Sequence, residues 1–216
     1  MNVFARVINK LRKVVYEKYY RQKTVADYRD RIANTDFSII CNNCFGGMLS
    51  HDLGLKFLSP TINLYFDAED YIKFLENLSF YLNCEIIDGG GSGKGNVIGL
   101  LNGEIKLHAI HYDTFDELKD KWNERKMRVN YDNLFVIGAY RDNCTDDLVR
   151  RFCALPFKNK VFLSHKEIDC ENNDCIVKVK CGKNATEVPG ADMMASCKSR
   201  VYDNAFDFIR WLNRAL

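Results

Sequence analysis

A short apolar run that ends in thiols, amides and glycines carries the clearest chemical potential in the chain. Residues 38 to 47 read Ser-Ile-Ile-Cys-Asn-Asn-Cys-Phe-Gly-Gly. This pattern predicts a buried strand followed by a turn, whose glycines permit positive φ and the close approach of a ligand or of another backbone. Cys44 would then follow the carboxyl end of a strand, where open α/β sheets bind their ligands. The ligand-contacting residues expected beside it are Asn42, Asn43, Gly46 and Gly47.

A nucleophilic Cys44 needs a base, and imidazole is the usual partner of a reactive thiol. The chain has 4 histidines, at positions 51, 108, 111 and 165. His111 ends a predicted strand and can face the same edge as Cys44, whereas His108 falls on the opposite face of that strand. We therefore assign Cys44 as nucleophile and His111 as base. The alternative is a buried, inert cysteine with a structural histidine.

The other cysteines give no pattern that a metal requires. Cys41 and Cys44 form a C-x2-C pair, but a zinc site needs a second pair at comparable spacing. The later cysteines, among them Cys170, Cys175 and Cys181, are widely and irregularly spaced. An odd total of 9 in a chain of this length favours reduced thiols, and we predict neither a metal nor a cofactor.

Two further segments offer groups for an anionic or sugar ligand. Trp122, Arg125 and Arg128 lie at i, i+3 and i+6, so the guanidinium groups can clamp a phosphate or carboxylate and the indole can stack on a ring. A solvated helix face with one packed tryptophan is the alternative. Arg141 and Asp142 follow another predicted strand, and Asp142 can bind a sugar hydroxyl or a metal, or cap the next helix.

Residues 89–95, Gly-Gly-Gly-Ser-Gly-Lys-Gly, have the composition of a phosphate-binding loop but not its G-x-x-x-x-G-K-[ST] spacing. They predict a flexible loop, with a mobile lid as the alternative.

Hydrophobic patterns alternate between strand and helix through most of the chain. This order predicts an α/β protein with a layered, mixed β-sheet flanked by helices, in which Asn102-Gly103 forms a hairpin. Asp67 is the expected N-cap of the first helix after residue 60. The predicted strands span residues 36–41, 61–66, 85–87, 97–101, 105–111, 134–139, 160–164 and 176–180, and the helices 67–82, 114–129, 145–152 and 204–216.

The first 35 residues differ from the rest in charge. They carry 9 Lys/Arg against 3 Asp/Glu, so the overall charge of +2 leaves about −4 for the remainder. Residues 3–21 have apolar side chains at helical spacing with basic residues between them, which predicts a basic amphipathic helix. It either docks on the core or contacts anionic lipid. We expect an arm, residues 1–35, and a single α/β domain, residues 36–216.

Charge and hydropathy exclude several classes. The acidic body argues against specific nucleic-acid binding. The start of the chain lacks the pattern of a signal peptide, and no apolar run reaches the roughly 18 residues that cross a bilayer. The expected location is the cytoplasm, with peripheral contact at the inner face of the membrane through residues 1–21.

Several of these segments, in this order, resemble the DUF1919 family of bacterial proteins associated with exopolysaccharide biosynthesis. The resemblance covers roughly residues 36–166. The order of cysteine, Ser-Pro, histidine and W-x2-R-x2-R is also similar to DUF1796, described as papain-like cysteine peptidases, although papain's Cys-Gly-[Ser/Ala]-Cys-[Trp/Tyr] signature is absent. The matching segments are 41–47, 52–55, 59–61, 70–75, His111-Tyr112, Lys121-Trp122 with Arg125 and Arg128, 133–136, Arg141-Asp142 with Cys144-Thr145, and 152–166.

The resemblance implies a role in making capsule or exopolysaccharide. We expect a transferase or hydrolase that acts through Cys44 and His111 on an activated sugar, a glycan or an acyl donor, the sugar being nucleotide- or lipid-linked. One alternative is a non-catalytic glycan-binding or scaffold protein of a membrane-associated assembly. Another is a metal-independent glycosyltransferase in which Asp142 or His111 is the base and Cys44 is inert.

Overall fold

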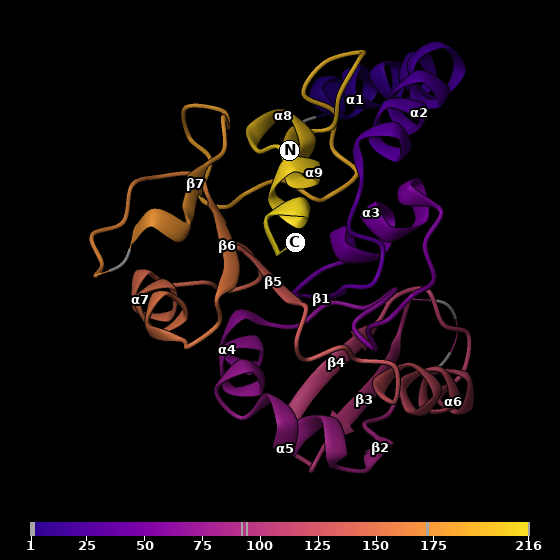
Figure 1. Cartoon of the computed structure of the whole chain (residues 1–216), viewed down its shortest axis with the longest axis vertical. Coiled ribbons are helices and arrows are strands. Elements are labelled where there is room, and N and C mark those ends of the chain that lie inside the picture. The colour runs from indigo at the N-terminus through magenta and orange to yellow at the C-terminus, as the bar shows by residue number, and fades with distance from the viewer. Residues whose placement is uncertain (1–2, 92, 94, 172, 216) are drawn as a thin grey trace.

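The parallel sheet is the centre of the fold. A computed structural model describes residues 3–91, 93, 95–171 and 173–215. Four parallel strands follow the order β1-β5-β6-β7 (Figure 1). Every residue of β1 and β5 is buried, because helices cover both faces of such a sheet and its strands are apolar throughout. The strands are β1 (Ser38–Cys41), β5 (Leu134–Ala139), β6 (Asn159–Ser164) and β7 (Ile176–Lys178).

A second, antiparallel sheet lies beyond the β1 end of the first. It has the order β2-β3-β4, with bounds Ile86–Asp88, Val97–Leu101 and Ile105–Ala109. Buried residues alternate with partly exposed ones along β3 and β4, as expected for a sheet with one covered face. Asn102 and Gly103 adopt φ of 52° and 72° in the predicted hairpin, whose loop holds three residues, because Leu101 pairs with Ile105. The α/β class is therefore confirmed, with the strands divided between two sheets.

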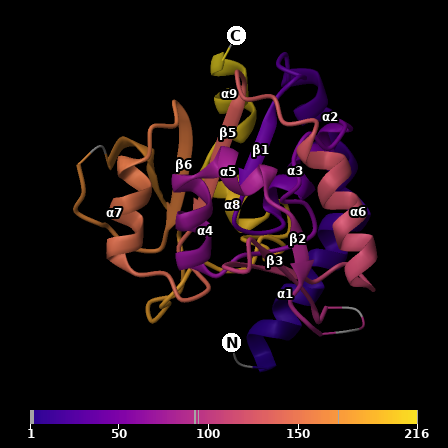
Figure 2. The same cartoon turned by 90° about the horizontal axis from the view of Figure 1, so that it is seen from below.

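Helices cover both faces of the parallel sheet. In Figures 1 and 2, α8 and α9 lie on one side and α4 on the other. Helix α6 packs on the antiparallel sheet against β2 and β3, and α4 contacts both α7 and β4. Thr114 and Thr145, the threonines before α6 and α7, each accept a hydrogen bond from a backbone N–H of the first turn. The helices are α3 (Phe45–Leu53), α4 (Ala68–Glu76), α5 (Leu78–Asn83), α6 (Phe115–Lys126), α7 (Asp146–Ala154), α8 (Val201–Ala205) and α9 (Phe208–Leu212), with 3-10 turns at Asn173–Cys175 and Asn213–Ala215.

The N-terminal arm is helical and docks on the body. Helices α1 (Val3–Val15) and α2 (Arg21–Arg31) are joined by a π-helical turn, Tyr16–Tyr20, and α2 packs on α3 and α9. Tyr16 is buried, and Lys13 Nζ pairs with Asp192 Oδ2 at 3.0 Å. Figure 2 shows α1 running away from the side of the molecule that holds the C-terminus. In the described part of the chain, no helix has the length and hydrophobicity needed to cross a membrane.

Three predicted elements differ from the observed ones. The segment 61–66 is irregular, with a single bridge between Tyr65 and His108, because Asn63 at φ 65° turns the backbone out of the extended conformation. The helix predicted over 67–82 breaks at Asn77, which gives α4 and α5. The predicted final helix is interrupted at Phe206, whose backbone is extended, and restarts where Asp207 accepts a hydrogen bond from Arg210 N.

The glycine-rich segment 89–95 joins β2 to β3. Two of its residues, 92 and 94, lie outside the described residues, and no helix opens among the others. Its described glycines at 90, 91, 93 and 95 all have positive φ, a backbone conformation that glycine adopts readily.

Candidate functional site

A cavity of about 520 Å³ opens at the carboxyl ends of β1 and β5. This is the edge where parallel sheets hold their ligands, because loops from neighbouring strands converge there. The cavity brings together four residues that the sequence singled out: Asn43, Cys44, His111 and Arg141. The remaining lining residues are Lys13, Met48, Asn63, Tyr65, Ile110, Gly190, Ala191 and Asp192.

Cys44 immediately precedes the first turn of α3, with its thiol partly buried. Among the described residues, the hydrogen-bond acceptor of this thiol is the Leu64 carbonyl, at 3.8 Å, rather than a histidine. Burial raises the pKa of the Cys44 thiol to about 12, the proximity of Cys41 adds to the rise, and the charge of Arg141 opposes it. The thiol is therefore protonated at neutral pH. Burial likewise raises the pKa of Cys41, to about 11.

The raised pKa gives a direct expectation for alkylation. Because only the thiolate reacts, Cys44 should react with iodoacetamide at pH 7 about 10³-fold more slowly than a peptide cysteine of pKa about 8.5. Its rate should then rise about tenfold per pH unit up to pH 10, as the thiolate fraction rises. Peptide mapping by mass spectrometry measures both quantities, with the exposed Cys197 as internal reference. Labelling at pH 7 as fast as that of a peptide cysteine would contradict a buried, protonated thiol.

The two asparagines between the cysteines hold the turn in place. Asn43 Oδ1 accepts a hydrogen bond from Phe45 N at 2.9 Å and so satisfies one backbone N–H at the start of α3. Asn42 Nδ2 donates to Ala139 O at 3.0 Å and so joins the end of β1 to the end of β5. Asn43 also lines the cavity. Asn42 is buried and does not line it, so the ligand contact expected of Asn42 is replaced by its hydrogen bond to β5.

The expectation of positive φ at Gly46 and Gly47 is wrong, because both residues lie inside α3 with helical backbone. Their lack of a side chain serves the close approach of α3 to the chain beneath it. A Cβ on Gly46 would lie 2.9 Å from Ile39 Cγ2, and one on Gly47 would lie 3.2 Å from Ile62 Cγ2. The glycines thus allow β1 and α3 to pack closely, and Gly47 also borders the neighbouring cavity described below.

Arg141 provides a positive charge at the end of β5. Its Nε donates to Asp142 Oδ2 at 2.7 Å, and both side chains are mostly buried. Asp142 and Asn143 adopt φ of 54° and 65°, a left-handed conformation that is unusual for residues other than glycine. This tight turn directs the guanidinium group toward the cavity, while the carboxylate of Asp142 is occupied by Arg141.

His111 lies at the mouth of the cavity, exposed to solvent. His108, which the sequence placed on the opposite face, instead lies in a polar pair next to the cavity. His108 Nε2 lies 3.0 Å from Asp67 Oδ2, and its ring stacks on Tyr65 with centroids 4.3 Å apart. Asp67 stands at the predicted N-cap of α4, but its side chain contacts His108 instead of capping the helix. Through Tyr65, this pair borders the cavity.

The anion clamp expected on α6 has other partners. Trp122 is only 1% exposed and packs against Phe74, so its indole is not available to a ligand. Arg125 Nη1 donates to Tyr112 OH at 2.8 Å. Arg128 pairs with Glu124 and also donates to the Phe57 carbonyl. Trp122 is therefore closed to a ligand, whereas Arg125 and Arg128, the latter beyond the end of α6 at Lys126, are partly exposed and already have partners within the protein.

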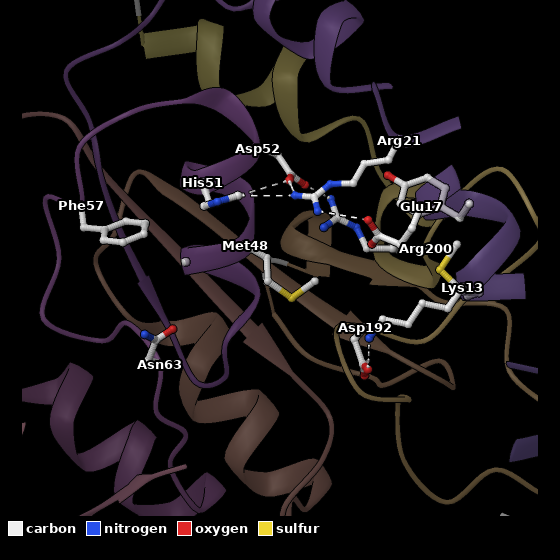
Figure 3. Close-up of a pocket in the computed structure, with 13 residues that line it drawn as sticks. Lys13, Glu17, Arg21, Met48, His51, Asp52, Phe57, Asn63, Asp192 and Arg200 are labelled. Atoms are coloured by element: carbon white, nitrogen blue, oxygen red, sulfur yellow. Dashed lines mark hydrogen bonds and ion pairs between the residues drawn. The ribbon is translucent and has the colours of Figure 1, made fainter. Parts of the chain in front are cut away.

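A second cavity, of about 430 Å³, adjoins the first and shares Lys13, Met48, Asn63 and Asp192 with it. Figure 3 shows an ion network along its wall, between the arm and α3. Arg21 Nη2 and Arg200 Nη2 each lie 2.7 Å from one oxygen of Asp52. Sequence reasoning missed this network, because its members are 31 to 179 positions apart and only folding brings them together.

Fold and cavity define this chain as an α/β protein with a polar, cysteine-bearing cavity at the carboxyl edge of a parallel sheet. The sequence model of the family described as "Domain of unknown function (DUF1919)" matches residues 15–213, and the chain belongs to this family. A Haemophilus influenzae (strain Rd) protein described as uncharacterized is 29% identical over 215 residues, covering 100% of both chains. The match also includes α2 and the C-terminal region, beyond the segments that first indicated the family.

Proposed function

We propose that the protein binds an anionic sugar derivative in the cavity at the end of β1 and acts on it as a transferase or hydrolase in exopolysaccharide biosynthesis. One observation carries the proposal, namely that a thiol, an imidazole and a guanidinium group line the same cavity. Arg141 and Lys13 would hold a diphosphate or carboxylate. Cys44 would attack the reacting carbon while the bond to its leaving group, such as the diphosphate, breaks, and His111 would accept the thiol proton.

The protonated state of Cys44 favours a second candidate at the same site. A thiol of raised pKa that donates to a backbone carbonyl is a poor nucleophile before substrate arrives. In a metal-independent glycosyltransferase, His111 would instead take the proton of an acceptor hydroxyl while Arg141 stabilises the leaving diphosphate. Asp142 is less suited to be the base, because Arg141 already occupies its carboxylate.

Two variants separate these candidates. Release of nucleoside diphosphate from a panel of nucleotide sugars, with and without exopolysaccharide acceptor, measures activity. If Cys44 is the nucleophile, Cys44→Ala and His111→Ala should each lower the rate about 10²- to 10⁴-fold. If His111 acts alone, only His111→Ala should do so. Cys197→Ala, outside the cavity, is the matched control. Binding of a sugar without turnover would support the non-catalytic alternative, and neither binding nor turnover would refute the proposal.

We further propose that α1 rests on an anionic membrane surface. Three of its apolar side chains point to solvent although the arm is docked: Val7, Leu11 and Val14 are 51%, 61% and 58% exposed. They lie at i, i+4 and i+7 and so form one stripe, and Lys10 beside them is exposed as well. Apolar side chains flanked by basic ones are the pattern of helices that lie in the lipid interface. Lys13 of the same helix lines the cavity, which favours a lipid-linked substrate.

Vesicle flotation tests this contact. The protein should float with vesicles containing phosphatidylglycerol and bind neutral phosphatidylcholine vesicles more weakly, because basic side chains add about 1 kcal/mol each at an anionic surface. Leu11→Asp combined with Val14→Asp should reduce binding at least tenfold, because it removes apolar burial and adds like charge. Met127→Asp, which changes an 81% exposed residue on the body, is the matched control. Equal binding by the arm variant would exclude the stripe as the contact surface.

A further inference from the structure

Three cysteines that are dispersed in the sequence meet at the edge of the parallel sheet away from β1. Cys153 is buried in α7, and Cys170 and Cys175 lie in the connection between β6 and β7. Cys170 Sγ lies 3.0 Å from Cys153 Sγ, and Cys175 Sγ lies 3.7 Å from the same atom. Cys153 is therefore within reach of both other sulfurs, while Cys170 and Cys175 are partly exposed.

We propose that Cys153, Cys170 and Cys175 form a thiol–disulfide exchange site that reacts with a low-molecular-weight disulfide such as oxidised glutathione. The inference does not depend on the proposed function. It rests on the two short sulfur–sulfur distances and on the access of solvent to the outer two thiols. The trio is not arranged as a metal centre, because no group of three or more His, Cys, Asp or Glu among the described residues is placed to hold one.

The surroundings of the three sulfurs assign their roles. A hydrogen bond from Cys153 stabilises the thiolate of Cys175, and the charge of Lys160 adds to this effect, so that the pKa of Cys175 is lowered to about 7. The contacts with Cys175 and Cys170, together with burial, raise the pKa of Cys153. Lys160 is held nearby, where its Nζ donates to the Cys153 and Leu155 carbonyls. Cys175 is thus the thiol that attacks first, and Cys153 is the thiol that attacks the resulting mixed disulfide.

The exchange takes three displacements. The Cys175 thiolate attacks oxidised glutathione, forms a mixed disulfide and releases one glutathione thiolate, which takes up a proton. Cys153 then loses its proton and attacks the sulfur of Cys175, which forms the Cys153–Cys175 disulfide and releases the second glutathione. Finally Cys170 attacks Cys153 and expels Cys175, which is the best leaving group because its pKa is the lowest. Two thiols have become one disulfide, and oxidised glutathione has become two reduced molecules.

Peptide mapping of the full chain after exposure to oxidised glutathione at pH 7.5 tests this sequence. The expected product is a Cys153–Cys170 disulfide with the Cys175 thiol restored. Cys170→Ser should stop the reaction at Cys153–Cys175. Cys175→Ser should slow disulfide formation about tenfold at pH 7 and remove a rate increase centred near pH 7. Cys153→Ala should form neither of these disulfides, and the Cys175 variant keeps the test valid if Cys153→Ala fails to fold.

Cys197 provides the control in the same sample. It is exposed and outside the trio, so it should form a simple mixed disulfide with glutathione, and Cys197→Ser should leave the reaction of the trio unchanged. The proposal is overturned if Cys197 is modified while positions 153, 170 and 175 all remain thiols. A disulfide that joins other cysteines and omits Cys153 would overturn it equally.

Discussion

Replacing Asp52 by alanine should lower the free energy of unfolding by about 3–5 kcal/mol, the usual cost of leaving a buried charge without its partner. Asp52 is 3% exposed at its side chain, and each of its oxygens is paired with a guanidinium group. Arg200, with a side chain only 6% exposed, would retain Asp203 alone, and Arg21 of the arm would lose its ion pair with α3 and keep only the 3.4 Å contact with His51 Nδ1 of that helix. Urea denaturation monitored by tryptophan fluorescence measures the change.

Asp27→Ala is the matched control for this prediction. Asp27 also pairs with an arginine of the arm, Arg31, but both side chains are largely exposed. Such pairs contribute at most about 1 kcal/mol, since solvent screens them. If Asp52→Ala lowers the free energy of unfolding no more than Asp27→Ala does, water reaches the network and burial does not set its strength. The double variant Asp52→Ala with Arg21→Ala should cost less than the sum of the single changes, since the two residues share one interaction.

The second large effect is expected on ligand affinity when Arg141 is replaced. Arg141→Ala should weaken the binding of an anionic sugar derivative about 10- to 150-fold, which corresponds to the 1.5–3 kcal/mol of a charge-assisted hydrogen bond. The side chain borders the cavity, and the tight turn that begins at Asp142 fixes its position. Isothermal titration calorimetry with uridine diphosphate glucose, and with pyrophosphate as the bare anion, measures the loss.

Two further arginine variants make the Arg141 result specific. Arg141→Lys keeps the charge but loses the bidentate fork, so its affinity should lie between those of wild type and Arg141→Ala. Arg150→Ala removes an exposed arginine of α7 outside the cavity and should leave binding unchanged. If pyrophosphate binds wild type and Arg141→Ala equally, the anion site lies elsewhere, with Lys13 the next candidate.

Sequence patterns predicted most helices and strands, because a buried face places apolar side chains at the repeat of the helix or strand that carries it. The apolar runs 134–139 and 97–101 both became strands with the expected bounds. Segment 61–66, in which four of six residues are hydrophobic, was also predicted as a strand but did not form one. There the left-handed backbone of Asn63 and the pairing of Tyr65 with His108 decided the conformation. A local pattern contains no information about such a partner, which lies more than 40 positions away.

The candidate site, too, has a part that the sequence could predict and a part that it could not. Residues that follow a strand, such as Cys44 and Arg141, could be expected at one edge, because parallel strands end together. The environment of each group could not be expected. Whether Cys44 is ionised depends on its burial beside the Leu64 carbonyl, and whether α6 offers a clamp depends on which face it turns to the core.

The sequence by itself determined the α/β class, the helical arm with its basic charge and the family, because these follow from periodicity, composition and the order of motifs along the chain. Tertiary structure alone decided which charges and thiols meet. Lys13 pairs with Asp192, 179 positions away, and Asp52 pairs with two arginines that are distant in sequence. Cys153 contacts two sulfurs from the connection between β6 and β7. Such contacts depend on how the elements pack, and packing responds to the shape and burial of the whole chain, not to any one segment.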